Sequence, residues 1–249
     1  MSIYNTSFQL AIEDLTVSFD GFKAVDGLNL YIEKNELRVI IGPNGAGKTT
    51  VLDMICGKTK PTEGSIRFFN KELVGMPEHE IVRQGVGRKF QTPSIYENLT
   101  VEENLEVSFP RGRSVLGCIA FKRTKDVDER IHKVAEEIFL ADLLETPGAQ
   151  LSHGQKQWLE IGMLLMQEPK LLMLDEPVAG MSAGEREQTA ELLKRITQGR
   201  SIIIIEHDME FVSRIAHKVT VLHLGKLLAE GSMEQIRQNP KVIEVYLGH

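Results

Sequence analysis

Eight consecutive residues of the chain have the types and the spacing of a phosphate-binding loop. They fit the pattern G-x-x-x-x-G-K-[ST] and are Gly42, Pro43, Asn44, Gly45, Ala46, Gly47, Lys48 and Thr49. The glycines let successive backbone N–H groups turn toward phosphate oxygens. Lys48 is expected to contact the β- and γ-phosphates, the Thr49 hydroxyl to bind Mg²⁺, and Thr50 to touch the α-phosphate. The loop therefore predicts that the chain binds a nucleotide together with magnesium.

Two neighbouring carboxylates, Asp175 and Glu176, follow the apolar run 171–174. If that run is a parallel strand, both acids lie at its carboxyl end, where ligands bind in such sheets. Asp175 would hold Mg²⁺ through the water shell of the metal, and Glu176 would take a proton from an attacking water or orient it. An apolar strand that ends in two acids fits a structural role equally well, so the pair gains its meaning from the phosphate-binding loop.

The segment LSHGQ, residues 151–155, carries an anion-binding signal at a helix start. Ser152 and Gln155 have the spacing of a capping box, which predicts a helix over residues 156–166. Gly154 is expected to leave the amino terminus of that helix uncovered, so that free N–H groups are available to an anion. A well-capped helix without a ligand is the alternative interpretation.

Short apolar runs alternate with helical patterns, and these are the elements that must position the three motifs. Strands are expected at 8–19, 29–32, 37–41, 171–174 and 202–205, with a turn at 20–21 and a helix at 47–56. Runs that are apolar on both faces and separated by helices favour a parallel sheet covered on both sides. The middle of the chain is mostly helical, and residues 127–140 place an apolar stripe on one helix face.

We therefore expect one α/β domain over residues 1–249. Its core would comprise residues 1–91 and 166–249. A helical subdomain would occupy residues 92–165 and contain the segment LSHGQ.

The overall composition argues against several classes of function. The chain has 29 Lys and Arg against 35 Asp and Glu, which disfavours a protein that binds nucleic acid through its phosphates. No apolar run approaches the ~20 residues of a membrane span, and the first residues do not resemble a signal peptide. Cys56 and Cys118 lack metal-type spacing and are expected to be reduced thiols. Residues 111–125 hold five basic residues and no acid, which fits a solvated loop or a contact with a partner.

Together the motifs resemble those of ABC ATPases, the nucleotide-binding subunits of ATP-binding-cassette transporters, over nearly the whole chain. LSHGQ is similar to the LSGGQ signature, Gln91 in RKFQT to the Q-loop glutamine, and His207 after the run 202–205 to the switch histidine. Phe19 resembles the aromatic residue that stacks on adenine. Taken singly, the three residues would also fit a surface amide, a helix-start histidine and a core phenylalanine.

The resemblance implies a P-loop NTPase core of the RecA-like type with a mainly parallel sheet, an amino-terminal antiparallel β subdomain and an inserted α-helical subdomain. It implies Mg²⁺-dependent hydrolysis of ATP to ADP and phosphate. The catalytic residues implied are Glu176, His207 and Gln91, and those implied at the metal are Thr49, Gln91 and Asp175.

The resemblance also implies partners. Two ATPase subunits, identical or not, would enclose two ATP molecules head to tail. Each would lend the other its signature residues Ser152, His153, Gly154 and Gln155. The pair would work at the cytoplasmic face of a membrane with transmembrane permease subunits and, indirectly, with a substrate-binding protein.

Within the family, the chain is similar to the branched-chain amino acid importer group and, inside it, to the ATPase subunit of urea importers. The segments that carry this resemblance are LSHGQKQWLEIGMLL, EPVAGMS, IIIIEHDMEFV and NPKVIEVYLG. Urea is the implied cargo, with branched-chain amino acids next. Three residues depart from the family pattern: His153 replaces a signature glycine, Trp158 stands where arginine is common, and Ser182 where many members have aspartate.

Other classes of protein remain open as alternatives. A non-transport ABC ATPase that acts on nucleic acid or the ribosome would need tandem cassettes or long coiled coils, and neither is found in the sequence. A GTPase would need the motif N-K-x-D, whereas residues 70–73 read NKEL. A small-molecule kinase needs no signature segment. Glu176 and His207 argue against a nucleotide-binding structural subunit with little activity.

Overall fold

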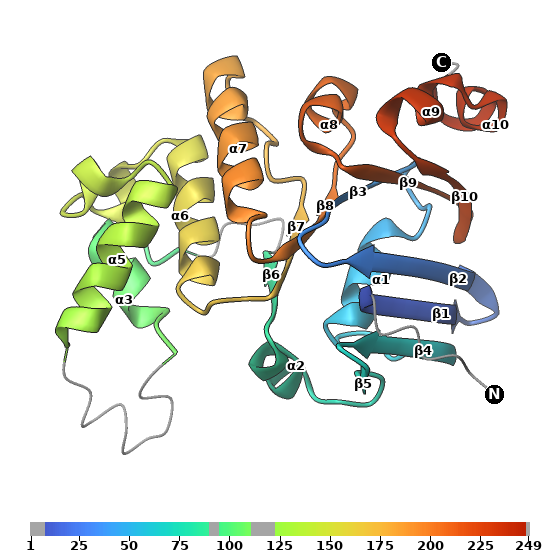
Figure 1. Ribbon diagram of the computed structural model, residues 1–249, viewed down its shortest axis with the longest axis horizontal. Coiled ribbons are helices and arrows are strands. Elements are labelled where there is room, and N and C mark those ends of the chain that lie inside the picture. Colours follow the sequence, from blue (N-terminus) through green and yellow to red (C-terminus); the bar gives the residue numbers. More distant parts are fainter. Residues whose placement is uncertain (1–7, 90–94, 111–122, 248–249) are drawn as a thin grey trace.

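Two β-sheets and a helical region make up the molecule (Figure 1). The computed structural model describes residues 8–89, 95–110 and 123–247. Gln91, Cys118 and most of the basic segment 111–125 therefore lie outside the described residues. Cys56, which is described, is a free thiol.

The smaller sheet is antiparallel and has the strand order β2-β1-β4-β5. Its strands are β1 (Phe8–Phe19), β2 (Phe22–Glu33), β4 (Glu63–Phe68) and β5 (Lys71–Glu72). The predicted turn at residues 20–21 joins β1 to β2, and both of its residues adopt positive φ angles. The second strand is longer than the predicted run 29–32, because its first half is only partly buried and has no continuous apolar pattern.

The larger sheet has the order β10-β9-β3-β8-β7-β6 and is parallel except for β10. Its strands are β3 (Leu37–Ile41), β6 (Val86–Lys89), β7 (Leu171–Asp175), β8 (Ser201–Ile205), β9 (Lys218–His223) and β10 (Lys226–Gly231). Every residue of β3, β7 and β8 is buried, as expected for strands covered on both faces. The expected fold class, a mainly parallel core with an antiparallel β part, is confirmed.

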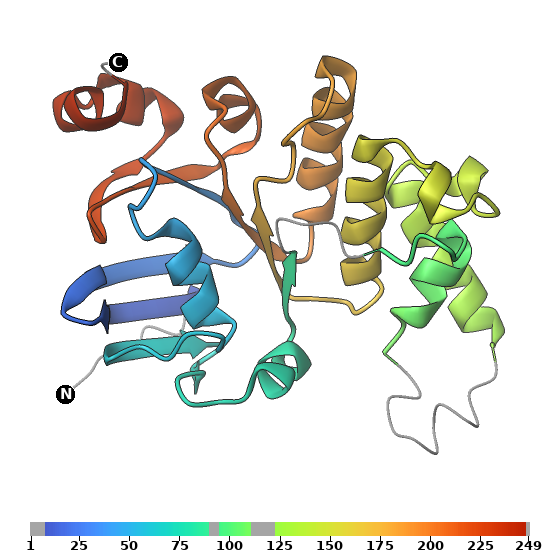
Figure 2. The ribbon, with the colours of Figure 1, turned by 180° about the vertical axis from the view of Figure 1, so that it is seen from behind.

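Helices cover both faces of this sheet (Figure 2). The helix α1 (Lys48–Ile55) packs between the two sheets, in one apolar cluster with Ile40, Met173 and Ile203. The opposite face packs against α7 (Ala183–Ile196), α8 (Met209–Ile215) and α9 (Met233–Gln238). The helix α2 (Glu78–Gln84) packs on the same side as α1, through Ile81. The chain ends with α10 (Pro240–Val242) and a π-helical turn, Ile243–Leu247, within the described residues.

The helical region contains α3 (Val101–Val107), α5 (Lys125–Glu137) and α6 (His153–Leu165), with two 3₁₀ turns, Ala141–Leu143 and Gly148–Gln150. The helix expected over 127–140 ends earlier, because Phe139 has a φ of 60° and cannot continue it. The helix expected over 156–166 begins earlier, at His153, because Ser152 caps it. None of the described helices combines the length and the apolar character needed to cross a bilayer.

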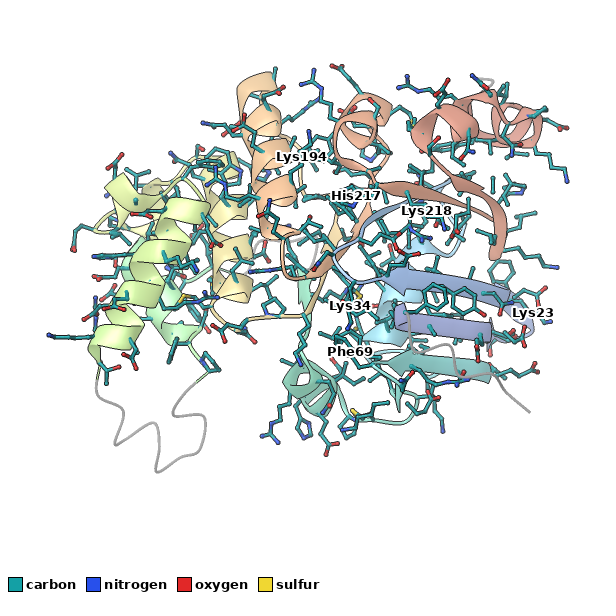
Figure 3. The ribbon with its side chains drawn as sticks, viewed as in Figure 1. Lys23, Lys34, Phe69, Lys194, His217 and Lys218 are labelled. Carbon is teal, nitrogen blue, oxygen red and sulfur yellow. The ribbon has the colours of Figure 1, made fainter. Side chains whose placement is uncertain are left out.

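A buried ionic network fixes the amino-terminal end of β3 against the neighbouring strands. The Arg38 guanidinium is fully buried, pairs with Glu36 and Glu230, and donates to the Tyr31 carbonyl at 2.9 Å. Lys218, labelled in Figure 3, pairs with Glu230 at 2.5 Å. The network therefore ties β2, β3, β9 and β10 together at the end of the sheet opposite the carboxyl ends of the parallel strands.

Candidate nucleotide site

The order of the strands brings the predicted motifs to one edge of the sheet. The strand β8 lies between β3 and β7, and Ile205 pairs in register with both Ile40 and Asp175. The phosphate-binding loop follows β3, Asp175 ends β7, and His207 follows β8. Because the three strands are parallel and in step, these segments meet at their carboxyl ends.

The phosphate-binding loop has the backbone shape that its glycines predict. Gly42 and Gly47 have φ angles of 147° and 96°, and a Cβ at either position would collide with a backbone carbonyl, of Leu222 or Ala24 respectively. The Lys48 ammonium lies over this loop and donates to the carbonyls of Gly42 and Pro43, at 2.8 and 2.9 Å. Burial lowers the pKa of Lys48, while the carboxylates of Glu176 and Asp175 oppose that shift. A cation is thus held over the start of the phosphate-binding loop.

Thr49 and Asp175 form a candidate magnesium site. The Thr49 hydroxyl donates to Asp175 Oδ2 at 3.2 Å, and Asp175 is 2% exposed. Burial raises the pKa of Asp175, and the hydrogen bond from Thr49 opposes it. Its other oxygen, Oδ1, is buried and has no hydrogen-bond partner among residues 8–89, 95–110 and 123–247. A hydroxyl and a buried carboxylate with a spare oxygen fit Mg²⁺, which commonly takes one or two protein ligands beside water and phosphate.

Within the described ranges, no group of three or more His, Cys, Asp and Glu could hold a metal ion. Gln91, the other expected metal ligand, is outside the described residues.

Glu176 and His207 lie beside each other above the ends of β7 and β8. His207 Nδ1 is 3.6 Å from Glu176 Oε1, and both side chains reach solvent, at 64% and 38% exposure. Glu176 has a φ of 48°, so the chain turns sharply after β7. The Glu176 N–H donates to the Ile205 carbonyl at 2.9 Å. A carboxylate and an imidazole are therefore placed together at the open edge of the site.

Two further residues support this edge and were not expected from the sequence. Glu206 is 1% exposed and accepts the N–H groups of Val178 and His207, at 3.4 and 3.1 Å. Burial raises the pKa of Glu206, and these hydrogen bonds oppose the shift. Burial also raises the pKa of the Tyr246 phenol, which hydrogen-bonds with the backbone of Gly42. In the sequence, the signal for Glu206 is its position directly after the apolar run 202–205, and that position does not show whether the acid is buried or exposed.

The segment LSHGQ forms the start of α6. Ser152 and Gln155 make the predicted capping box, with N–H donation in both directions at 3.2 and 2.9 Å. The expectation that Gly154 leaves this terminus uncovered is wrong. Gly154 is buried, a Cβ there would collide with the Glu185 carboxylate, and Ser152 Oγ donates to Glu185 Oε1 at 3.1 Å.

The three residues that depart from the family pattern make contacts with the loop after Glu176 or with α7. The His153 ring nitrogen Nε2 lies 3.1 Å from the Ala179 carbonyl, and the Trp158 indole donates to Thr189 Oγ1 at 2.8 Å. Ser182 caps α7 and donates to Glu185, as an aspartate cap could not. Hydrogen bonds from Ser182 lower the pKa of Glu185, which keeps that carboxylate charged.

The remaining expected site residues are only partly assembled in one chain. Phe19 ends β1 with a side chain that is 50% exposed. In the described part of the chain, no hydrogen bond joins residues 152–155 to the phosphate-binding loop; their bonds run to the loop after Glu176 and to α7.

The family model described as "ABC transporter" matches residues 25–179. This chain belongs to the ABC transporter family. A second model, described as "Branched-chain amino acid ATP-binding cassette transporter", matches residues 226–249 of this cassette.

Relatives match along the full length of the cassette. The high-affinity branched-chain amino acid transport ATP-binding protein BraF of Pseudomonas aeruginosa is 38% identical, over 96% of this chain and 97% of its own length. The corresponding LivG protein of Escherichia coli K12 is 36% identical over the same shares. The cassette is therefore of the branched-chain amino acid importer type, which agrees with the expected family.

Solved structures share its fold. The ADP conformation of the ATP-binding cassette MJ1267 superimposes with a TM-score of 0.85 at 32% identity, covering 97% of this chain and 99% of that one. A dimeric post-hydrolysis structure of the cassette MJ0796, bound to ADP and phosphate, shares the fold at 23% identity with a TM-score of 0.74, covering 90% and 98%.

Proposed function

We propose that this chain is the ATP-hydrolysing subunit of an ABC importer for a small solute. One arrangement carries the proposal: β3, β8 and β7 end side by side. Lys48 and Thr49, His207, and Asp175 with Glu176 therefore face one edge of the sheet. The resemblance of each motif to an ABC ATPase supports the same assignment.

The loop of residues 42–47 would bind the triphosphate through its N–H groups, and Lys48 would exchange its two carbonyl acceptors for phosphate oxygens. Thr50 would contact the α-phosphate and Phe19 the adenine. Thr49, Asp175 and Gln91 would hold Mg²⁺, which when bound offsets the negative charge of the reacting phosphates.

Glu176 is the proposed general base. A water would attack the γ-phosphorus while its proton passes to the Glu176 carboxylate, and the bond from the γ-phosphorus to the bridging oxygen of ADP would break. His207, 3.6 Å away, would orient that carboxylate. The products are ADP and inorganic phosphate.

A complete site is proposed to need two subunits. The exposed side chains of Ser152 and His153, with the neighbouring residues Gly154 and Gln155, would approach the nucleotide held by a partner. The exposure of Ser152 and His153 supports that arrangement, as does the dimeric cassette MJ0796. The partner is a second copy or a related ATPase.

The subunit would act peripherally, on the cytoplasmic face of a membrane, beneath permease subunits and with a substrate-binding protein upstream. Residues 92–165 are proposed as its helical subdomain and residues 1–91 with 166–249 as its core. Urea is the first proposed cargo, from the segments EPVAGMS and IIIIEHDMEFV. Branched-chain amino acids are the second, because the relatives BraF and LivG are named for their transport.

The test is to purify the membrane complex that this chain pulls down and to rebuild it in vesicles. ATP hydrolysis that depends on Mg²⁺, with ATP-driven uptake of labelled urea or leucine, is the expected result. A complex with Lys48→Ala is the matched control, and hydrolysis equal to wild type in that control would reject the site. Uptake of leucine but not urea would reject urea as the cargo and would leave the proposed ATPase activity standing.

A further inference from the structure

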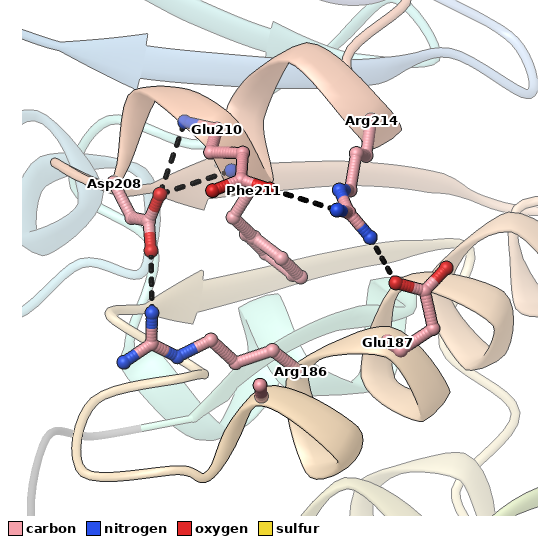
Figure 4. Close-up of a pocket in the computed structure, with 7 residues that line it drawn as sticks. Arg186, Glu187, Asp208, Glu210, Phe211 and Arg214 are labelled. Atoms are coloured by element: carbon pink, nitrogen blue, oxygen red, sulfur yellow. Dashed lines mark hydrogen bonds and ion pairs between the residues drawn. The ribbon is translucent and has the colours of Figure 1, made fainter.

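A small charged cavity lies between the starts of α7 and α8, beside the edge that carries Glu176 and His207 (Figure 4). Its volume is about 140 Å³, and Arg186, Asp208 and Arg214 are among the residues that line it. Both arginines join α7 to α8, but they do so at different places. Because of this difference, Arg186 can position the site, whereas Arg214 only adds a surface ion pair.

Arg186 makes contacts with both loops that carry the proposed catalytic residues. Its Nε donates to the Met181 carbonyl at 3.1 Å, in the loop that follows Glu176. Its Nη1 donates to Asp208 Oδ2 at 2.9 Å, directly after His207. A guanidinium presents such donors in a fixed planar fork, so the two contacts define one relative position of the two loops.

Asp208 is itself held in place, which makes it a firm anchor. Its Oδ1 accepts the N–H groups of Glu210 and Phe211, both at 3.0 Å, and so caps α8. Because one oxygen caps the helix and the other receives Arg186, the carboxylate couples the start of α8 to the loop of Met181. Movement of that loop away from α8 would break the contact.

We propose that Arg186 is a positioning residue of the ATPase, which holds the loop after Glu176 and the loop of His207 in the arrangement that places their side chains together. The inference rests on the proposed function. Arg186 does not touch the reacting atoms; it acts through Met181 and Asp208. The ion pair is 45% exposed at Arg186, so its contribution to overall stability is small and its effect falls on the geometry of the two loops.

The experiment measures steady-state ATP hydrolysis by the assembled complex. Arg186→Ala is expected to lower kcat by about tenfold while KM for ATP stays within about twofold, because small misplacements of reacting groups reduce rate more than binding. The kcat of Arg186→Lys is expected to lie between those of wild type and Arg186→Ala, since an ammonium can bind Asp208 but lacks the planar fork that also reaches Met181.

Two further variants separate positioning from a structural role. Asp208→Asn keeps an N-cap but presents an amide donor to Arg186, so its kcat is expected to equal that of Arg186→Ala. The double variant is expected to have a kcat no lower than that of either single variant. Arg214→Ala is the matched control: Arg214 pairs with Glu187 and Glu210 in the same cavity, away from both loops, and its loss is expected to leave kcat unchanged.

A wild-type kcat in Arg186→Ala would overturn the proposal. So would losses that multiply in the double variant, or an equal loss in Arg214→Ala. If wild type itself hydrolyses no ATP, the proposed function fails. If wild type is active and Arg186→Ala equals it, only this inference fails. Should Arg186→Ala not fold, Asp208→Asn and Arg186→Lys give the same decision.

Discussion

His207 Nδ1 lies 3.6 Å from Glu176 Oε1, although the two residues follow different strands. The contact exists because β7 and β8 are parallel neighbours, with Asp175 opposite Ile205. Glu206 supports it from inside by accepting the N–H groups of Val178 and His207. The edge that carries Glu176 and His207 thus depends on strand register and on one buried acid.

Replacing Lys48 with alanine should abolish ATP binding. The ammonium lies over the loop that is proposed to bind phosphate, and charge-assisted contacts to phosphate are among the strongest in a site. Calorimetric titration with Mg-ATP should show affinity lower by about a hundredfold or more. Lys194→Ala, an exposed lysine of α7, is the control and should bind as wild type does. Tight binding by Lys48→Ala would exclude the loop as the nucleotide site.

Replacing Glu176 with glutamine should leave ATP binding intact but slow hydrolysis by about 10²–10⁴-fold, because an amide cannot accept the proton from water. The side chain keeps its size and its place beside His207. Single-turnover release of labelled phosphate is the measurement, with nucleotide affinity determined on the same preparation. Turnover at the wild-type rate would reject Glu176 as the base.

The glycines Gly154 and Gly184 should respond differently to alanine. A Cβ at Gly154 would push the flexible Glu185 carboxylate away from Ser152 Oγ, and the loss of that hydrogen bond, about 1 kcal/mol, should cancel the gain in helix propensity. Gly184 is in α7 with open space around it, and Gly184→Ala should add about 0.5–1 kcal/mol. Urea unfolding curves of both variants decide the matter; equal shifts would mean that Glu185 does not occupy the start of α6.

Glu206 should give stability a dependence on pH. Burial raises its pKa in the folded protein, so its contribution to stability is complete below the unfolded pKa and is lost as pH rises through the folded pKa. As pH rises above 4.5, the usual pKa of a glutamic acid, the free energy of unfolding of wild type should fall relative to that of Glu206→Gln. Glu234→Gln, at an exposed position of α9, should follow wild type. Parallel curves for wild type and Glu206→Gln would show that the buried acid does not titrate in this range.

Local patterns in the sequence predict the elements that carry their own signal. The strand before Gly42 and the capping box of Ser152 appear in the structure, because an apolar run and a cap depend on neighbouring residues. Glu185 beside Gly154, and Arg186 between Met181 and Asp208, depend on how α7 packs against α6 and α8. No local pattern encodes that packing, so the sequence presents Arg186 as an ordinary surface charge and Glu185 only as the capping-box partner of Ser182.

The central claim, that two subunits enclose shared ATP, is tested most directly by light scattering on Glu176→Gln. The variant is measured with saturating Mg-ATP and with Mg-ADP, alone and mixed with the second ATPase subunit of its complex. The account predicts the mass of two subunits with ATP and of single subunits with ADP. Single subunits in every mixture would contradict it.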